Sequence, residues 1–170
     1  SPPPALADEE LAAQLTAMGW TIVKLTTLHR TIRPDLLDTP NVLITSGSGD
    51  LGGENTTPDN LYMLGMFALE PGQSLELEFR PPETRYWSVT LENIWHECLE
   101  PLVRLSSVTN KGVGPDADGV VRLVIAGEDP GRGHWLDTGG RPRGFIVVRW
   151  LDNPNAPDVT LRLSEKDTVR

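Results

Sequence analysis

Apolar positions near the start of the chain follow a helical spacing. Between Ala7 and Arg33 they recur every three or four residues, at Leu11, Leu15, Met18, Ile22, Leu25 and Leu28. This spacing places them on one face of an α-helix. The acidic residues at positions 8–10 are typical of a helix N-terminus, and Pro34 lies beyond the end of the pattern. We therefore expect an amphipathic helix that packs against a sheet through Leu11, Leu15, Met18, Ile22 and Leu25.

From residue 41 onward the pattern changes to short β-rich runs separated by Gly, Pro, Asn and Asp. The run Tyr86–Glu92 alternates between apolar and polar residues, whereas 120–126 and 144–150 are apolar at nearly every position, as in central strands. The predicted strands are Val42–Thr45, Leu61–Leu69, Ser74–Phe79, Tyr86–Glu92, Leu102–Ser106, Val120–Ala126, Gly144–Trp150 and Asp158–Leu163. The side chains expected in the core are Trp87, Val89, Leu91, Val121, Leu123, Ile146 and Val148.

The order of these elements indicates the fold class. Eight short strands with no helical pattern between them favour antiparallel sheets. The predicted fold is mainly β, a jelly-roll-like antiparallel β-sandwich with one N-terminal amphipathic helix packed outside it. We assign residues 1–40 to a Pro-rich start and the helix and residues 41–170 to the β-sandwich, as one structural unit.

Composition and charge narrow the class of protein. With 170 residues, 38% of them hydrophobic, the chain is long enough for one domain with a core. Its net charge of −9 repels phosphate groups, so we expect no nucleic-acid partner. The single Cys98 cannot form an internal disulfide, and no apolar stretch approaches the roughly 20 residues of a membrane span. These features predict a soluble protein and favour the cytoplasm.

The segment from Asp129 to Gly140 mixes residue types that neither helices nor strands select. It holds four glycines, two carboxylates, His134 and Trp135 within twelve residues. One interpretation is catalytic, with His134 as general base and Asp137 or Asp129 as its orienting or acid partner. The other is a structural loop whose glycines supply positive φ angles. In that case we expect Asp137 to accept backbone hydrogen bonds and Trp135 to be mostly buried.

A second group of candidate residues follows the predicted strand Tyr86–Glu92. Trp95, His96 and Glu97 lie just past its end, where binding groups are often displayed. Trp95 and Trp135 lie in predicted loops and are the aromatic candidates for stacking on a ligand. We expect a ligand surface, if formed, to use these two tryptophans together with His96 and Glu97.

Histidines and carboxylates of both segments are candidates for a divalent-metal site. Imidazole and carboxylate ligands from His96, Glu97, His134 and Asp137 would suit zinc, manganese or iron. The order of residues from His96 onward does not itself specify zinc, because Glu100 stands where the motif H-E-x-x-H needs its second histidine.

Asp116 and Asp118 open a segment that begins like a calcium loop. The third oxygen ligand and the distal Glu of such a loop do not follow in the sequence. Asp118-Gly119 directly before a predicted strand instead favours a turn.

Short motifs between residues 58 and 151 occur in a specific order. They are Asp59-Asn60-Leu61-Tyr62, Leu64-Gly65-Met66-Phe67, Arg85-Tyr86-Trp87-Ser88-Val89, Asn93-Ile94-Trp95, Asp129-Pro130-Gly131, Trp135-Leu136-Asp137-Thr138 and Arg149-Trp150. This order resembles the bacterial domain-of-unknown-function family 1214, whose members are often joined to a companion domain. The resemblance implies a jelly-roll-like β-sandwich and no settled activity. His134 departs from it, since the family has Asn at that position.

The resemblance also bears on partners. Family members are much longer than this chain, which opens at Ser1 without an initiator Met. We therefore expect a companion domain or a missing N-terminal portion to be a partner.

Three functions stay open on the sequence. The first is a non-catalytic module that binds a small molecule or glycan, or that interacts with another domain, because no complete catalytic constellation is evident. The second is a hydrolase- or lyase-type enzyme that uses His134 with Asp137 or Asp129. The third is the divalent-metal site at His96, Glu97, His134 and Asp137.

Overall fold

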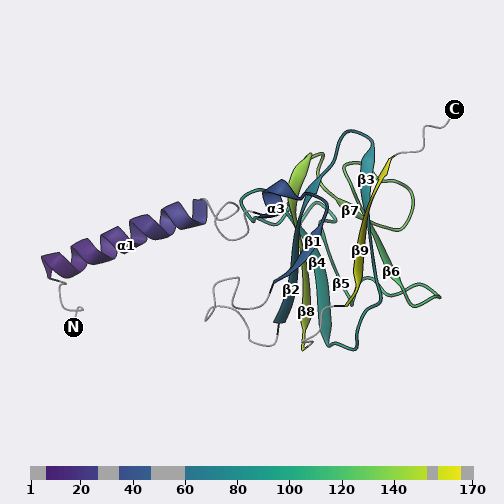
Figure 1. The fold of residues 1–170 in the computed structure, drawn as a ribbon, viewed down its shortest axis with the longest axis horizontal. Helices are drawn as coiled ribbons and strands as arrows, with labels where there is room; N and C mark the ends of the chain where they lie inside the picture. The colour runs from purple at the N-terminus through teal and green to yellow at the C-terminus, as the bar shows by residue number, and fades with distance from the viewer. Residues whose placement is uncertain (1–6, 27–34, 47–59, 153–156, 166–170) are drawn as a thin grey trace.

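The computed structural model describes residues 7–26, 35–46, 60–152 and 157–165. Within these ranges the chain forms one long helix, one single-turn helix and nine strands (Figure 1). In chain order the elements are α1 (Asp8–Thr26), α3 (Asp35–Asp38), β1 (Leu43–Ser46), β2 (Asn60–Ala68), β3 (Gln73–Phe79), β4 (Tyr86–Glu92), β5 (Ser107–Thr109), β6 (Val121–Ala126), β7 (His134–Asp137), β8 (Arg143–Leu151) and β9 (Val159–Glu165).

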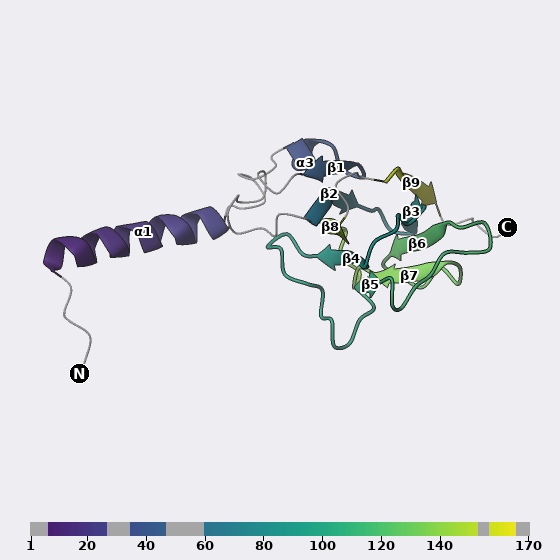
Figure 2. The same cartoon turned by 90° about the horizontal axis from the view of Figure 1, so that it is seen from below.

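The strands form two sheets that pack as a sandwich (Figure 2). The first sheet has the order β1-β2-β8-β4-β5, and its neighbouring strands are all antiparallel. The second has the order β7-β6-β3-β9 and is mixed, because β6 and β7 are parallel. The predicted mainly β sandwich with one N-terminal helix is confirmed, while the jelly-roll arrangement stays a prediction.

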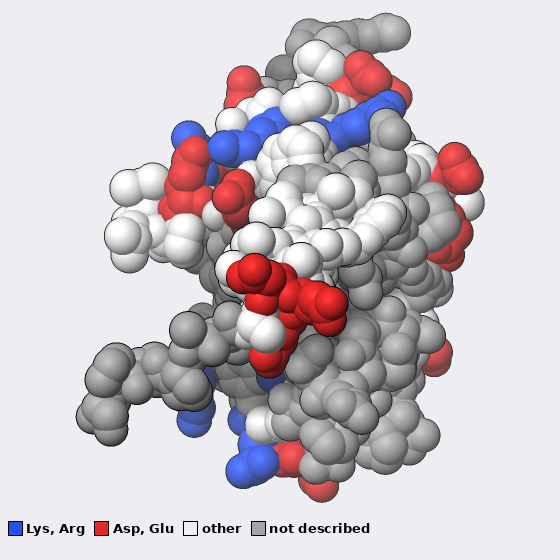
Figure 3. Space-filling view, turned by 90° about the vertical axis from the view of Figure 1, so that its left-hand side faces the viewer, with Lys and Arg blue, Asp and Glu red and all other residues white. Residues whose placement is uncertain are grey.

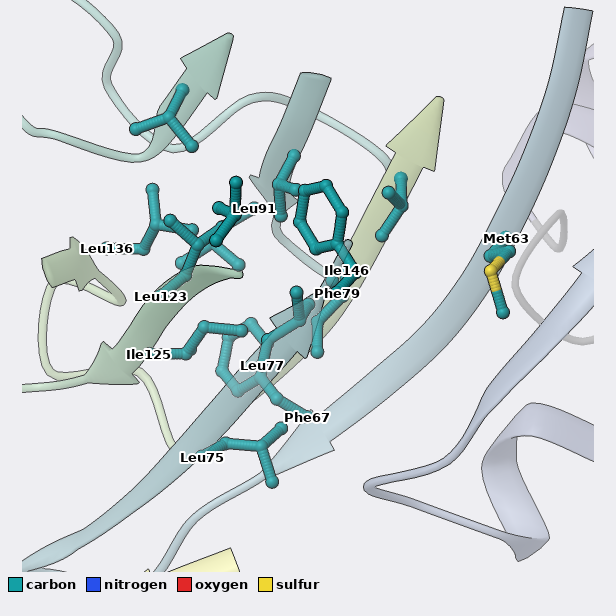
Figure 4. Packing of buried hydrophobic residues seen from close by; sticks show 14 of the residues in the cluster. Met63, Phe67, Leu75, Leu77, Phe79, Leu91, Leu123, Ile125, Leu136 and Ile146 are labelled. Carbon is teal, nitrogen blue, oxygen red and sulfur yellow. The ribbon is translucent and has the colours of Figure 1, made fainter. Parts of the chain in front are cut away.

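The core lies between the two sheets. All seven side chains predicted to fill it are buried, and Trp87 is only 3% exposed. The ring of Phe79, from β3, lies edge-on to Trp87 of β4 at a centroid distance of 5.1 Å. Figure 4 shows Leu77 and Leu123 of the second sheet gathered with Phe67 of the first in this space. The alternation of Tyr86–Glu92 therefore predicted the correct buried face.

A second, smaller apolar cluster covers the outer face of the first sheet. Leu36 of α3 packs there against Leu64, Met66 and Phe145, all of them buried. This cluster explains why β8 is apolar at nearly every position, because its alternate residues face the core on one side and α3 on the other.

The apolar stripe of α1 does not make the predicted contact with the sheet. Leu11, Leu15, Met18 and Ile22 are 44–60% exposed, and α1 points away from the sandwich (Figures 1 and 2). On the outer face of the first sheet, the side chain that packs against the small apolar cluster is Leu36 of α3. The predicted contact of Leu25 and the pattern beyond Thr26 fall outside the described side chains. In the part of the chain that the structure describes, neither helix has the length and apolar character that crossing a bilayer requires.

Two segments differ from the predicted strands. Residues 102–106, predicted as a strand, belong to the connection between β4 and β5, because Val103 N and Arg104 N both donate to Glu100 O in a helical turn. Strand β7 lies inside the segment from Asp129 to Gly140, where the sequence pattern predicts no strand. Gly131 and Gly133 have φ angles of 67° and 64°, which let the chain turn back and pair with β6 in parallel.

Candidate functional site

The connection between β4 and β5, residues 93–106, carries or contacts most of the predicted site residues. Trp95, His96 and Glu97 lie on it, and Asp137 is joined to it because Asp137 N donates to Leu105 O over 2.8 Å. Figure 2 shows the connection extending away from the two sheets, beyond the labels of β4 and β5. We refer to this segment below as the β4–β5 connection.

Asn93 builds the first turn of the β4–β5 connection. Its Oδ1 accepts hydrogen bonds from Trp95 N and Glu97 N over 2.8 and 3.1 Å. Its Nδ2 donates to Glu97 Oε2 over 2.7 Å. His96 has a φ of 60°, a conformation that suits a tight turn and is uncommon for a residue with a side chain. The turn therefore holds the Glu97 carboxylate against Asn93 and leaves the Trp95 side chain 55% exposed.

His96 is fixed against the outer face of the first sheet. Its Nδ1 lies 2.8 Å from Glu92 Oε2, and its ring stacks on Phe145 at a centroid distance of 4.0 Å. Only 22% of the His96 side chain is exposed. The carboxylate and the aromatic ring together set the orientation of the imidazole.

An ionic network ties the second half of the β4–β5 connection to β7. Arg104 Nη1 donates to Asp137 Oδ2 over 2.8 Å, and Arg104 Nε donates to Glu100. Arg141 Nη2 also donates to Glu100, over 3.0 Å. Hydrogen bonds from Arg104 and Arg141 lower the pKa of the Glu100 carboxyl below its usual value. The network neutralises these charges among themselves.

Asp137 occupies the position expected of a structural carboxylate. It is buried, and its Oδ1 accepts a hydrogen bond from Gly139 N over 2.6 Å. Its other oxygen binds Arg104. Trp135 is half-buried, and its Nε1 donates to Ala126 O over 3.0 Å. Both side chains therefore use their polar atoms in holding β7 and the β4–β5 connection in place.

His134 is separated from its predicted carboxylate partners. It is exposed at the start of β7, and Asp137 ends the same strand. Three residues of extended chain span about 10 Å and reverse the direction of the side chain. The carboxylate of Asp129 accepts a hydrogen bond from Gly131 N over 2.8 Å. Among the described residues, neither Asp129 nor Asp137 hydrogen-bonds to His134, so the structure does not assemble the predicted catalytic pair.

The predicted four-residue metal site is not formed. Within the described ranges, no three or more His, Cys, Asp or Glu side chains group closely enough to hold a metal ion. The reason is the layer arrangement: His96 and Glu97 follow β4 of the first sheet, whereas His134 and Asp137 sit at opposite ends of β7 in the second. His96 and Glu97, which resemble the start of the motif H-E-x-x-H, belong to the turn that Asn93 builds.

The structure adds exposed apolar residues that the sequence pattern assigned to a strand. Leu102 is 97% exposed and Val103 80% exposed, at the tip of the β4–β5 connection. Ile94, Trp95 and Leu105, on the same connection, are exposed as well. One signal in the sequence favours a turn here, since Pro101 directly precedes the apolar run and proline is typical of turns.

Asp116 and Asp118 form the predicted turn and bind an arginine. Gly119 N donates to Asp116 O over 2.8 Å, while Arg122 donates to Asp116 Oδ2 over 2.7 Å and to Asp118 Oδ2 over 2.5 Å. Arg122 lowers the pKa of the Asp118 carboxyl to about 2. Arg122 therefore binds the carboxylate oxygens of Asp116 and Asp118 that a calcium ion would need.

We predict that Arg122→Met raises the pKa of Asp118 toward the ordinary value of about 3.9. The stabilisation that the ion pair contributes is present above that ordinary value and is lost as the pH falls toward about 2. An NMR titration of the Asp118 carboxyl carbon measures the shift. An unchanged pKa in the variant would show that Arg122 does not control this carboxylate.

Comparisons with known proteins define the fold but assign no activity. No family model matches the chain, and a search of curated proteins found no match. The chain is similar to the crystal structure of an uncharacterised protein from Burkholderia cenocepacia, with a TM-score of 0.87 and 22% identity. The similarity covers 99% of this chain and 47% of the Burkholderia chain. A protein from Vibrio parahaemolyticus has a TM-score of 0.49 and 16% identity, over 94% of this chain and 47% of that one. The chain thus spans about half the length of both solved chains.

Proposed function

We propose that this chain is a domain-interaction module that binds a companion protein domain through the β4–β5 connection. The docking surface consists of five exposed apolar residues, Ile94, Trp95, Leu102, Val103 and Leu105. The observation that supports the proposal is that these residues are exposed on a segment whose backbone is firmly held. Apolar patches of this kind on a rigid support are typical of protein interfaces.

Backbone and side-chain contacts fix the shape of the docking surface. Leu99 is buried in the core, and its N–H donates to Leu91 O over 3.2 Å. Leu91 N in turn donates to Ser106 O over 2.8 Å. Arg104 anchors the segment to Asp137. A surface that is ordered before binding loses little conformational entropy on association, which favours affinity.

The shape and chemistry of the docking surface favour a protein partner over a small ligand. Small-molecule and glycan sites are concave and surround most of the ligand. Leu102, by contrast, is 97% exposed and projects from the domain. Such a projection fits into an apolar cleft of a partner, where an aliphatic or aromatic anchor becomes fully desolvated.

Charges around the docking surface are compatible with this partner. Arg104 and Arg141 both bind Glu100, so a partner can approach without leaving these charges unpaired. Glu97 is exposed but is held by Asn93. The companion domain implied by the resemblance to family 1214 is the partner that we propose.

Photo-crosslinking tests the proposal in cells that produce the protein. We place p-benzoylphenylalanine at Leu102 and, in a second variant, at Val103, and identify the adducts by mass spectrometry. Lys111 is the matched control, because it is exposed and lies near the opposite end of β4 and β5. We expect the same protein domain to be captured at Leu102 and Val103 and not at Lys111.

Two outcomes would contradict this function. One is the absence of any protein adduct at Leu102 and Val103. The other is an identical set of adducts at Lys111, which would indicate collisions without specificity.

A further inference from the structure

The two carboxylates of the β4–β5 connection differ in how their charges are balanced. Glu100 is bound by Arg104 and Arg141. Glu97, within the described residues, forms no ion pair and is held by the neutral amide of Asn93. We propose that Glu97 pairs with a lysine or arginine of the companion domain. The pairing rests on the proposed function, since the docked domain supplies the cation.

Hydrogen bonds hold Glu97 in a defined position before a partner binds. Asn93 Nδ2 donates to Glu97 Oε2 over 2.7 Å, and Asn93 Oδ1 accepts from Glu97 N over 3.1 Å. An amide donor carries no charge, so the negative charge of the carboxylate stays uncompensated. A cation that meets Glu97 therefore gains a charge-assisted hydrogen bond, and little side-chain entropy is lost because the carboxylate is already ordered.

Glu97 is the carboxylate of this turn that a docked domain can reach. It is exposed and follows Trp95, a residue of the docking surface, by two positions in the turn that Asn93 builds. Glu92, by contrast, has a side chain only 17% exposed, and its Oε2 lies 2.8 Å from His96 Nδ1. A charged side chain beside an apolar patch is the arrangement of an interface whose rim is polar.

The charge of the whole chain favours a basic partner as well. The net charge is −9, and Figure 3 shows acidic side chains gathered on the side of the molecule toward which α1 points. Opposite charge on the companion domain raises the rate of association, because the two fields attract before the surfaces touch. We therefore expect the cation that meets Glu97 to belong to a basic rim around the apolar cleft of the companion domain.

A basic side chain fits Glu97 better than a metal ion does. Within the described ranges no three His, Cys, Asp or Glu side chains group closely enough to hold a metal. Divalent cations such as calcium require several oxygen ligands, whereas an ammonium or guanidinium group needs only an acceptor for its N–H. Among the described contacts, Asn93 engages Oε2 of Glu97, which leaves Oε1 for such a donor.

Calorimetric titration with the domain captured at Leu102 tests the pairing at about 20 mM and about 500 mM salt. Glu97→Gln removes the charge and keeps the turn, because the new amide oxygen still accepts the hydrogen bond from Asn93 Nδ2. We expect this variant to raise the Kd about threefold at the lower salt concentration. The difference from the unmodified chain should vanish at the higher one, where exposed charges are screened.

Glu83→Gln is the matched control. Glu83 is exposed and precedes β4, whereas the β4–β5 connection follows this strand. The control removes the same single negative charge and therefore the same share of the long-range attraction, at a distance from the docking surface. We expect its Kd to match that of the unmodified chain at both salt concentrations.

Two results would overturn the pairing and leave the docking function intact, provided that Leu102→Asp still weakens binding. One is an equal Kd for Glu97→Gln and Glu83→Gln at the lower salt concentration. The other is a rise in Kd for Glu97→Gln that persists at the higher salt concentration, which would indicate a contact independent of charge. If no protein domain is captured at Leu102, the docking function and the pairing both fail.

Discussion

Truncation of Trp87 to Ala lowers the free energy of unfolding by about 3–5 kcal/mol, the range for a fully buried large aromatic side chain. Trp87 contacts Phe79 across the sandwich, and its loss leaves a cavity between the sheets. Urea denaturation followed by circular dichroism measures the change. Trp20→Ala is the matched control, since Trp20 is exposed on α1, and it should change the value by less than about 0.5 kcal/mol.

A loss below about 1 kcal/mol for Trp87→Ala would place that side chain outside the packed core. The register of β4 would then be shifted by one residue, since a one-residue slip exchanges the two faces of a strand.

Replacement of Asp137 by Ala lowers the free energy of unfolding by about 1–3 kcal/mol, because Gly139 N–H loses its buried acceptor. Arg104 loses its partner as well, and with it the link between the β4–β5 connection and β7. We therefore expect faster amide hydrogen exchange at Asp137 N, which donates to Leu105 O.

Asp129→Ala provides the comparison for Asp137→Ala. Asp129 is exposed and accepts a hydrogen bond from Gly131 N. We expect the free energy of unfolding of Asp129→Ala to lie within about 0.5 kcal/mol of that of the unmodified protein. Equal stability of the Asp137→Ala variant and the unmodified chain would contradict a structural role for this carboxylate. It would restore Asp137 as a candidate for ligand binding.

Sequence pattern predicted the parts of the fold that packing governs. Residues of β4, β6 and β8 that were expected to face inward are buried, because alternation and apolar content report directly on sheet faces. The same reasoning failed for Leu102, where an apolar run reflects exposure on a turn. Periodicity records that a side chain is apolar and does not record what covers it.

The candidate site was predictable only in part. Trp95, His96 and Glu97 were located at the end of β4, as their sequence position indicated. The ion pair between Arg104 and Asp137 joins residues far apart in the chain, and no local sequence pattern predicts such a pair. Likewise, the apolar spacing of α1 predicted a contact with the sheet, but the side chain that packs on the outer face is Leu36 of α3.

The central claim is that the β4–β5 connection is a docking surface for a protein domain. Isothermal titration calorimetry with the domain captured by crosslinking tests it most directly, using Leu102→Asp and, as control, Lys111→Ala. We expect Leu102→Asp to raise the Kd by at least about tenfold and Lys111→Ala to leave the Kd unchanged. A Kd for Leu102→Asp within about twofold of that of the unmodified chain would contradict the claim.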